Sequence, residues 1–234
     1  MSIDINKIPL GTDNCYVIKE EGTIMIDSGT PKKGKRFVKS LKKLPIKPRD
    51  IKLIIITHGH WDHIGSAKEI KEITGAKIAM HQLEKDCLEK SLKPVPPAVN
   101  RWGHIFAWIM SRYMPLVHFP STDVEIILDN EEFSLAEFGI PGKVIHTPGH
   151  SSGSVSVLLE TGDAFVGDLA MNGFPLRIGP GLPIFAEDLQ KVKESWKMLL
   201  DMGVKNIYPA HGNPFSAEII RKVVKAQPSG FLTG

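Results

Sequence analysis

The sequence predicts an α+β protein in which two β-sheets pack against each other and helices cover their outer faces. Two observations support this prediction. Short apolar runs recur in both halves of the chain, and segments with helical periodicity follow them in each half. A doubly wound parallel sheet would instead alternate single strands and helices along the chain. With 234 residues, of which 42% are hydrophobic, the chain can form one substantial core.

The first half contains alternating strand and helix signals. Residues 14–28 are expected to form two strands around a turn at 20–22. The segment PKKGKRFVKSLKKL at 31–44 has apolar residues at helical spacing, which predicts a helix with a basic outer face. The run IKLIII at 51–56 is almost wholly apolar and β-branched, so we expect a buried central strand. A helix near 65–74, a short strand at 77–80 and a helix near 82–92 should follow.

The second half begins with a series of short strand signals. They lie at 124–128, 132–137, 144–147, 154–160 and 164–167. A helix at about 186–202, a strand at 206–208 and a closing helix at about 215–226 complete the predicted elements.

Residues 94–120 form an aromatic-rich insertion in what we predict to be a single domain spanning residues 1–234. One interpretation is an additional amphipathic helix that covers the core. The other is a lid or apolar wall over a site, which would select substrates with hydrophobic groups. Its aromatic and methionine side chains could also form a homodimer surface or touch a membrane interface.

Composition and charge narrow the class of protein. The formal net charge of +3 is too close to neutral to predict a polyanionic partner. No apolar run approaches the ~20 residues of a transmembrane helix, so no transmembrane segment is expected. The beginning of the sequence, MSIDINKIPL, lacks the cationic flank and apolar core of a secretory signal, and the two cysteines form no disulfide framework. The expected location is the cytoplasm.

The strongest functional signal is THGHWDHIG at 57–65, directly after the predicted buried strand. It places four metal-ligand side chains within six residues. These are His58, His60, Asp62 and His63. Imidazole nitrogens and carboxylate oxygens are the usual ligands of zinc and similar divalent ions. Because alternate positions project to one side of an extended chain, His58 and His60 can converge on one ion, while Asp62 and His63 can serve a second.

Three further candidate ligands follow predicted strands elsewhere in the chain. His150 lies in TPGHSSGSVS, Asp168 in FVGDLAMNG and His211 in YPAHGNP. Each lies at a junction between a strand and a loop, where protein scaffolds commonly display functional groups. One cluster cannot complete two metal sites, so these residues are expected to supply the missing ligands.

The order of these motifs resembles that of the metallo-β-lactamase superfamily. The resemblance extends from Asp27 in IDSG, through the cluster at 58–63, to His211. It implies a four-layer αββα sandwich of two mixed β-sheets with outer helices, and a metal site at one edge between the sheets.

The resemblance also implies a role for each motif residue. His58, His60 and His150 would hold a first ion, Asp62, His63 and His211 a second, and Asp168 would bridge the two. Asp27 would support the ligands without binding metal, because a carboxylate beside an imidazole fixes its orientation. The alternative for Asp27 is a strand-end residue that caps a turn.

Two divalent ions close together lower the pKa of a shared water towards neutrality. We therefore expect a hydrolase that attacks an ester, thioester, lactone or β-lactam with a metal-bound hydroxide. Asp62 is the candidate catalytic residue, because it could orient the nucleophile or receive a proton. Zn²⁺ is the preferred metal, although iron or manganese would suit the same nitrogen and oxygen ligands.

Two other functions stay open at this point. One is a phosphodiesterase or ribonuclease of the same fold, which the basic residues at 32–43 support; the aromatic insertion favours a small-molecule substrate over nucleic acid. The other is an oxidoreductase with one iron, similar to persulfide dioxygenases. Arg177, in the Gly/Pro-rich segment 171–185, is a candidate contact for an anionic substrate group.

Overall fold

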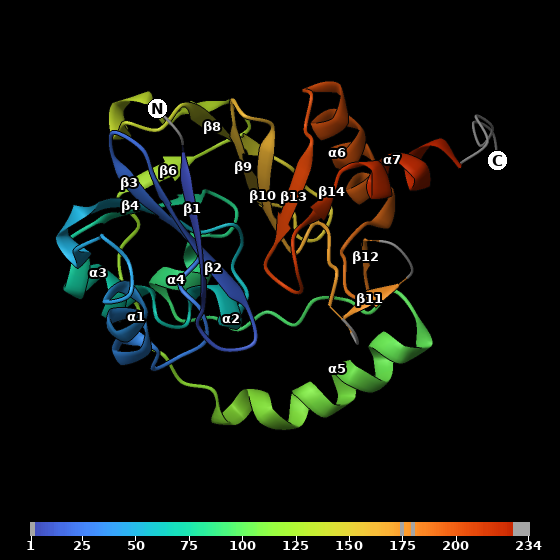
Figure 1. Cartoon of the computed structure of the whole chain (residues 1–234). Helices are drawn as coiled ribbons and strands as arrows, with labels where there is room; N and C mark the ends of the chain where they lie inside the picture. The colour runs from blue at the N-terminus through green and yellow to red at the C-terminus, as the bar shows by residue number, and fades with distance from the viewer. Residues whose placement is uncertain (1–2, 174–175, 179–180, 227–234) are drawn as a thin grey trace.

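The computed structural model describes residues 3–173, 176–178 and 181–226, and its strands form two mixed sheets (Figure 1). In the first sheet the strands follow one another in chain order. They are β1 (Asp4–Pro9), β2 (Asn14–Lys19), β3 (Thr23–Ile26), β4 (Ile51–Ile55), β5 (Lys77–His81) and β6 (Ile126–Leu128). The pairs β1–β2 and β2–β3 are antiparallel, whereas β3 to β6 run parallel.

The second sheet has the order β14-β13-β10-β9-β8-β7. Its strands are β7 (Phe133–Ser134), β8 (Gly142–His146), β9 (Val155–Leu159), β10 (Asp163–Gly167), β13 (Asn206–Pro209) and β14 (Phe215–Ser216). Only β10 and β13 pair in parallel. A small hairpin of β11 (Arg177–Ile178) and β12 (Leu182–Pro183) lies apart from both sheets.

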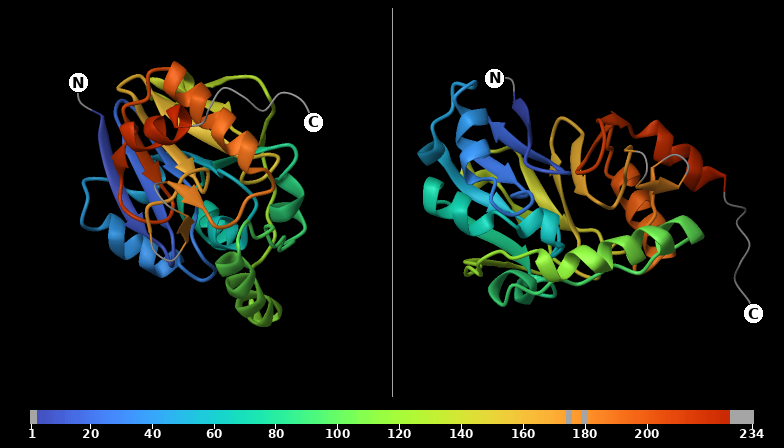
Figure 2. Two further views of the ribbon diagram at one scale, coloured as in Figure 1. Left: turned by 90° about the vertical axis from the view of Figure 1, so that its right-hand side faces the viewer. Right: turned by 90° about the horizontal axis from the view of Figure 1, so that it is seen from below.

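The helices lie on the outer faces of the two sheets or at the lower edge of the molecule (Figure 1). They are α1 (Gly34–Leu41), α2 (Trp61–Ile64), α3 (Ala67–Thr74), α4 (Lys85–Glu89), α5 (Arg101–Tyr113), α6 (Leu189–Asp201) and α7 (Glu218–Lys225). Helices α1 and α3 lie beside the first sheet and α6 and α7 beside the second, whereas α5 runs along the lower edge (Figures 1 and 2). Among the described residues, no helix is long and apolar enough to cross a membrane.

Three apolar clusters separate the layers. In β4, Leu53 and Ile55 belong to the cluster between the two sheets, whereas Ile54 packs with α1 and α3 on the outer side. In β10, Phe165 points between the sheets and Val166 points toward Trp196 of α6. This alternation follows from the two-residue period of a strand. The predicted sandwich of two mixed sheets with outer helices is therefore confirmed.

Several predicted elements have different bounds in the structure. The helix predicted at 31–44 is shorter, because Lys32 has a φ of 64° and the Lys33 N–H donates to the Ser66 hydroxyl. The helix predicted at 82–92 is likewise limited to Lys85–Glu89, after a turn at 82–84. The strand predicted at 132–137 stops early, since Ala136–Phe138 forms a 3₁₀ turn that ends at Gly139 with a φ of 66°.

The composition of the sheets differs from the predicted elements at three places. The strand predicted at 124–128, assigned to the second half, is β6 and pairs with β5 in the first sheet. The helix predicted at 215–226 begins only at Glu218, because Phe215–Ser216 adds strand β14 to the second sheet. The sequence also gave no indication of β1, which extends the first sheet at its edge.

The insertion at 94–120 contains the helix α5 and a 3₁₀ turn at Met114–Leu116. The Asn100 side chain caps α5 by accepting a hydrogen bond from the Gly103 N–H at 2.7 Å. Gly103 is the one buried residue of this helix. The insertion thus contains a helix, but little of its surface is buried, so this helix does not cover the core in the way that the first interpretation expected.

Candidate metal centre

The loop after β4 begins the site. Strand β4 ends at Ile55, and the chain then turns through 57–60 into the short helix α2, which carries Asp62 and His63. His58, His60 and His63 are all buried, with exposures of 1%, 7% and 0%. Burial of three imidazoles side by side needs compensation, because polar ring nitrogens removed from solvent must find other partners.

All seven predicted ligand side chains meet at this edge of the sheets. The donor atoms of each of two groups lie within 4.8 Å of one another. One group comprises His58, His60, His150 and Asp168, and the other comprises Asp62, His63 and His211. The residues come from loops after β4, β8, β10 and β13, so both sheets contribute.

Asp168 lies between the two groups. Its Oδ2 is 3.9 Å from Nε2 of His58 and 3.7 Å from Nε2 of His150. Its Oδ1 is 3.5 Å from Nε2 of His63 and 3.4 Å from Nε2 of His211. Each oxygen of this carboxylate therefore faces a different group of histidines.

The second ring nitrogen of most of these histidines has a partner. Nδ1 of His63 lies 2.9 Å from Oδ2 of Asp27, and Nδ1 of His58 lies 3.1 Å from the Thr57 hydroxyl. Nδ1 of His150 and Nδ1 of His211 face the backbone carbonyls of Phe185 and Thr12, at 3.0 and 3.2 Å. These contacts orient the rings and direct Nε2 of each one into the centre of the site.

Three buried atoms at the centre have no hydrogen-bond partner. They are Nε2 of His58, Nε2 of His63 and Oδ1 of Asp168. Unpartnered buried polar atoms are costly, and histidine and aspartate are residue types that commonly bind divalent cations. The donor atoms of each group are therefore suited to hold a divalent metal ion.

The two groups differ in their proton affinity. Burial, followed by neighbouring histidines, holds the pKa of His58 well below its usual value and lowers the pKa of His60 to about 3. Burial would also lower the pKa of His63 and His211. Around these two histidines, however, the negative charges of neighbouring carboxylates, including Asp168, outweigh the effect of burial. They raise the pKa of both histidines well above the usual value.

Glu84 is a residue of this site that the sequence did not indicate. Its side chain is buried, with Oε2 accepting from the Gly59 N–H at 2.9 Å and Oε1 accepting from the Gly153 N–H at 3.0 Å. One carboxylate thus ties the loop of His58 and His60 to the loop of His150. Neither glycine has room for a side chain, because an added Cβ would lie 2.6 and 2.5 Å from Glu84 atoms.

A cavity opens beside the ligand side chains. Its polar lining includes His60, Asp62, His150, Asp168 and His211. The remaining lining is mainly apolar and comes from α2, the insertion and the loops near β11, with Trp61, Pro94, Val95, Pro96, Phe106, Ala107, Met110, Met114, Met171, Leu176 and Phe185. No lysine or arginine lines it among the described side chains. The side chain of Arg177 lies outside the part of the chain that the structure describes.

The fold and this cluster of histidines and carboxylates define a class of metal-binding enzymes. The sequence profile of the metallo-beta-lactamase superfamily matches residues 8–211. The chain therefore belongs to the metallo-β-lactamase superfamily, a superfamily of metallohydrolases.

Similar proteins occur in distant organisms. The chain is 29% identical over 205 residues to the beta-lactamase-like protein 2 homolog of Drosophila melanogaster, covering 87% of this chain but only 59% of the fly protein. It is 26% identical over 179 residues to the hydroxyacylglutathione hydrolase GloC of Haemophilus influenzae, covering 74% of each chain. A solved structure of an archaeal superfamily protein, ST1585 from Sulfolobus tokodaii, matches with a TM-score of 0.68 and 24% identity, covering 98% of this chain and 91% of that one.

Proposed function

We propose that the protein is a dinuclear, metal-dependent hydrolase that cleaves an ester, thioester, lactone or β-lactam bond. The position of Asp168 carries this proposal, because each of its oxygens faces a different group of imidazoles. Two divalent ions, when bound in such a site, supply a nucleophilic hydroxide and polarise the scissile carbonyl.

Each side chain has a distinct role in this proposal. His58, His60 and His150 hold the first ion, and Asp62, His63 and His211 hold the second. Asp168 bridges the two, and Asp27 orients His63 through its contact at 2.9 Å.

Asp62 is the proposed catalytic carboxylate. Its side chain is 15% exposed, compared with 7% for Asp168, and it lines the cavity. This exposure supports Asp62, rather than Asp168, as the carboxylate that orients a water molecule or accepts its proton.

Zinc is the proposed metal. The described donor set contains imidazoles and carboxylates but no thiolate, since Cys15 and Cys87 are not part of it. These ligands suit Zn²⁺ and would also accept iron or manganese. Two zinc ions per chain would agree with the proposal, whereas one iron would favour the oxidoreductase alternative.

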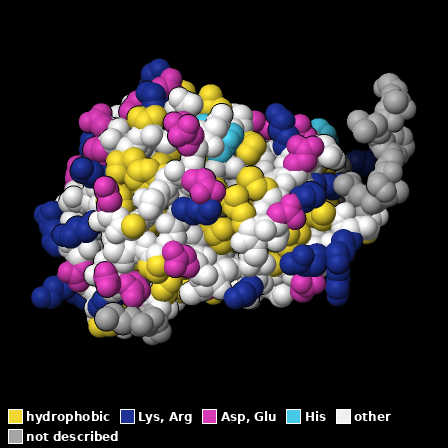
Figure 3. Space-filling model, turned by 90° about the horizontal axis from the view of Figure 1, so that it is seen from above, with side chains coloured by type: hydrophobic (Ala, Val, Ile, Leu, Met, Phe, Trp, Pro, Cys, Tyr) yellow, Lys and Arg dark blue, Asp and Glu magenta, His cyan; other side chains and the backbone are white. Residues whose placement is uncertain are grey.

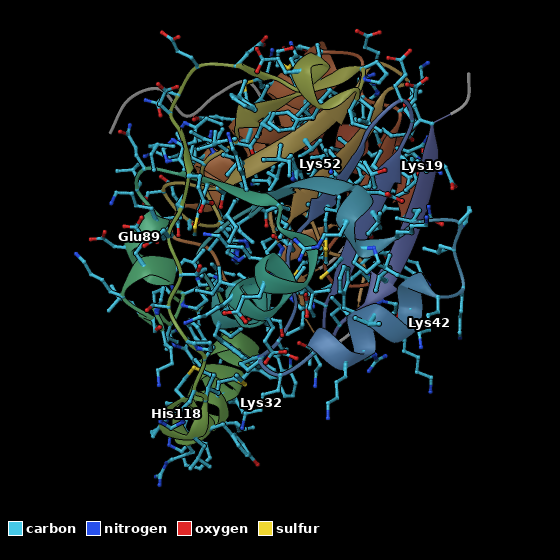
Figure 4. All side chains as sticks on the ribbon, turned by 90° about the vertical axis from the view of Figure 1, so that its left-hand side faces the viewer. Lys19, Lys32, Lys42, Lys52, Glu89 and His118 are labelled. Carbon is cyan, nitrogen blue, oxygen red and sulfur yellow. The ribbon has the colours of Figure 1, made fainter. Side chains whose placement is uncertain are left out.

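The proposed substrate is a small molecule with an apolar group near the scissile bond. Apolar side chains form most of the described lining, and an apolar surface favours hydrocarbon over charged groups. The basic residues at 32–43 support the alternative of a phosphodiesterase less well. None of them lines this cavity, and Lys32 and Lys42 extend from the surface near α1 (Figure 4).

A substrate panel with two matched variants tests the proposal. Hydrolysis of chromogenic lactam, lactone, thioester, ester and bis-phosphodiester substrates is measured after zinc loading, together with the metal content. Asp168→Asn should lower the turnover of an ester-type substrate by on the order of a hundredfold or more. Asp201→Asn removes an exposed carboxylate on α6 and should have no effect. Unchanged turnover in Asp168→Asn would exclude the bridging role, and cleavage of the phosphodiester alone would identify a nuclease.

A further inference from the structure

The outer face of α5 concentrates the exposed apolar surface of the molecule. Six of the eleven large hydrophobic side chains that the described chain exposes lie between residues 102 and 116. Trp108 is 62% exposed and Leu116 76%. Scattered exposed hydrophobic residues are normal on a protein surface, but a contiguous group of this kind marks an interaction site.

These side chains follow the periodicity of the helix. Trp102, Ile105, Ile109, Tyr113 and Leu116 recur at every third or fourth position, so they form one stripe. Phe106 and Met110 lie on the other side of the helix and line the cavity described above. We call this stripe, together with Trp108 beside it, the α5 outer face.

The charged residues of α5 and of the chain on either side of it have one sign. The sequence contains no aspartate or glutamate between Glu89 and Asp123, whereas Arg101 and Arg112 lie on α5 itself. The Arg112 guanidinium lies over the Trp108 ring, 5.3 Å from its centroid. On the top face of the molecule, by contrast, acidic and basic side chains are interspersed (Figure 3).

We propose that the α5 outer face docks on the surface of a lipid bilayer that contains anionic lipids. A helix with an apolar stripe, tryptophan and tyrosine on that stripe, and arginine as its only permanent charge is suited to the boundary between headgroups and acyl chains. The position of α5 permits this contact, because the helix lies along the lower edge of the molecule (Figures 1 and 2). Anionic headgroups would pair with Arg101 and Arg112.

A second copy of the chain is a less suitable occupant. In a symmetric contact of α5 with α5, the same surface would face itself. Arg101 and Arg112 would then approach each other's copies, and α5 contains no carboxylate that could pair with them. An anionic lipid surface supplies the missing negative charge.

Vesicle co-sedimentation of the full chain tests this inference without using its activity. The protein is mixed with vesicles of phosphatidylcholine alone or of phosphatidylcholine with phosphatidylglycerol. We expect binding to the mixed vesicles that is about tenfold tighter than binding to the neutral ones and that weakens with salt. The absence of binding to either kind of vesicle would overturn the proposal.

Two double variants identify the surface responsible. Ile105→Gln with Trp108→Gln removes two apolar side chains from the α5 outer face, and vesicle binding should weaken by about tenfold or more. Leu83→Gln with Ile127→Gln is the matched control, because both residues are exposed, at 59% and 49%, but lie outside α5. Circular dichroism verifies that each variant is folded.

The remaining outcomes also decide between occupants. Equal loss of binding in both double variants would show that the α5 outer face is not the surface that binds the vesicles. If sedimentation velocity reveals a dimer that only the α5 variant dissociates, and the wild type binds no vesicles, the α5 outer face belongs to a second copy and the proposal is wrong. Because neither readout depends on hydrolysis, failure here leaves the proposed function untouched.

Discussion

Oδ2 of Asp27 lies 2.9 Å from Nδ1 of His63, although 36 positions separate the two residues. Asp27 adopts a φ of 57°, in the left-handed region, directly after β3. Its Oδ1 also accepts a hydrogen bond from the Thr57 N–H at 2.8 Å. The buried carboxylate of Asp27 thus contacts both Thr57, at the start of the segment 57–63, and His63 at its end.

Replacement of Asp27 should weaken metal binding at the second group. Asp27→Asn preserves the size of the side chain, and asparagine tolerates a positive φ, so the backbone should keep its course. The amide is a weaker acceptor and no longer holds His63 with a charge. We expect the affinity of the second ion to fall by about 10- to 100-fold in competition with a chromophoric chelator. Asp201→Asn is the control, and equal affinities in both variants would contradict an orienting role for Asp27.

Replacement of Glu84 should destabilise the link between two loops of the site. In Glu84→Gln, only one of the two acceptors for the Gly59 and Gly153 N–H groups remains. A buried donor without a partner costs about 1–3 kcal/mol. The free energy of unfolding of the metal-free protein, measured in urea, should fall by this amount. Glu132→Gln changes an exposed carboxylate and should leave the value unaltered; a similar loss in both variants would refute the link.

Metal binding to the second group should release protons near neutral pH. The carboxylates of Asp27, Asp62 and Asp168 raise the pKa of His63 and His211. We therefore expect both imidazoles to be protonated near neutral pH in the metal-free protein, and each ring must lose a proton when it binds a metal. Burial lowers the pKa of His58, His60 and His150, which are therefore already neutral. The affinity for the second ion should rise with pH from mildly acidic to mildly alkaline solution, whereas that for the first should change little.

Isothermal titration with zinc in two buffers of different ionisation enthalpy would count these protons. The second binding event should depend on the buffer and the first should not. A second event that releases no protons would show that His63 and His211 are neutral before the metal binds.

A polar group in the cavity wall should alter substrate preference. Met110 lines the cavity from α5, and Met110→Gln keeps its length while adding an amide that must be desolvated. We expect the ratio of kcat/KM for a long-chain over an acetyl ester to fall by about tenfold. Met202→Gln, at a methionine that is 38% exposed, is the control. An unchanged ratio in Met110→Gln would show that the apolar group does not contact this wall.

The sequence was most informative where strands end in loops. The run at 51–56 is apolar enough to identify a buried strand, and the spacing in 57–65 places ligand side chains directly after it. Asp168 and His211 could be predicted by the same reasoning, because β10 and β13 are also short apolar strands. The side chains that the sequence proposed as one cluster do lie together in the structure.

Other features depend on contacts that leave no periodic signal. Glu84 binds two backbone N–H groups, at positions 25 and 69 residues away, and nothing in HQLE distinguishes it from a solvated acid. Strand β6 has three residues, too few to show which sheet it joins. In α5, apolar residues occupy both the cavity side and the solvent side, so the sequence alone did not separate its two faces.

Gly103 is the one buried residue of α5, and the proposed metal ligands lie outside this helix. The cavity wall and the proposed metal centre are therefore formed by separate segments of the chain. A different helix could be grafted at 101–113 without disturbing the imidazoles and carboxylates. Substitutions in α5 could then change the substrate preference while the ligand side chains stay the same. Such substitutions would need few compensating changes in the two sheets.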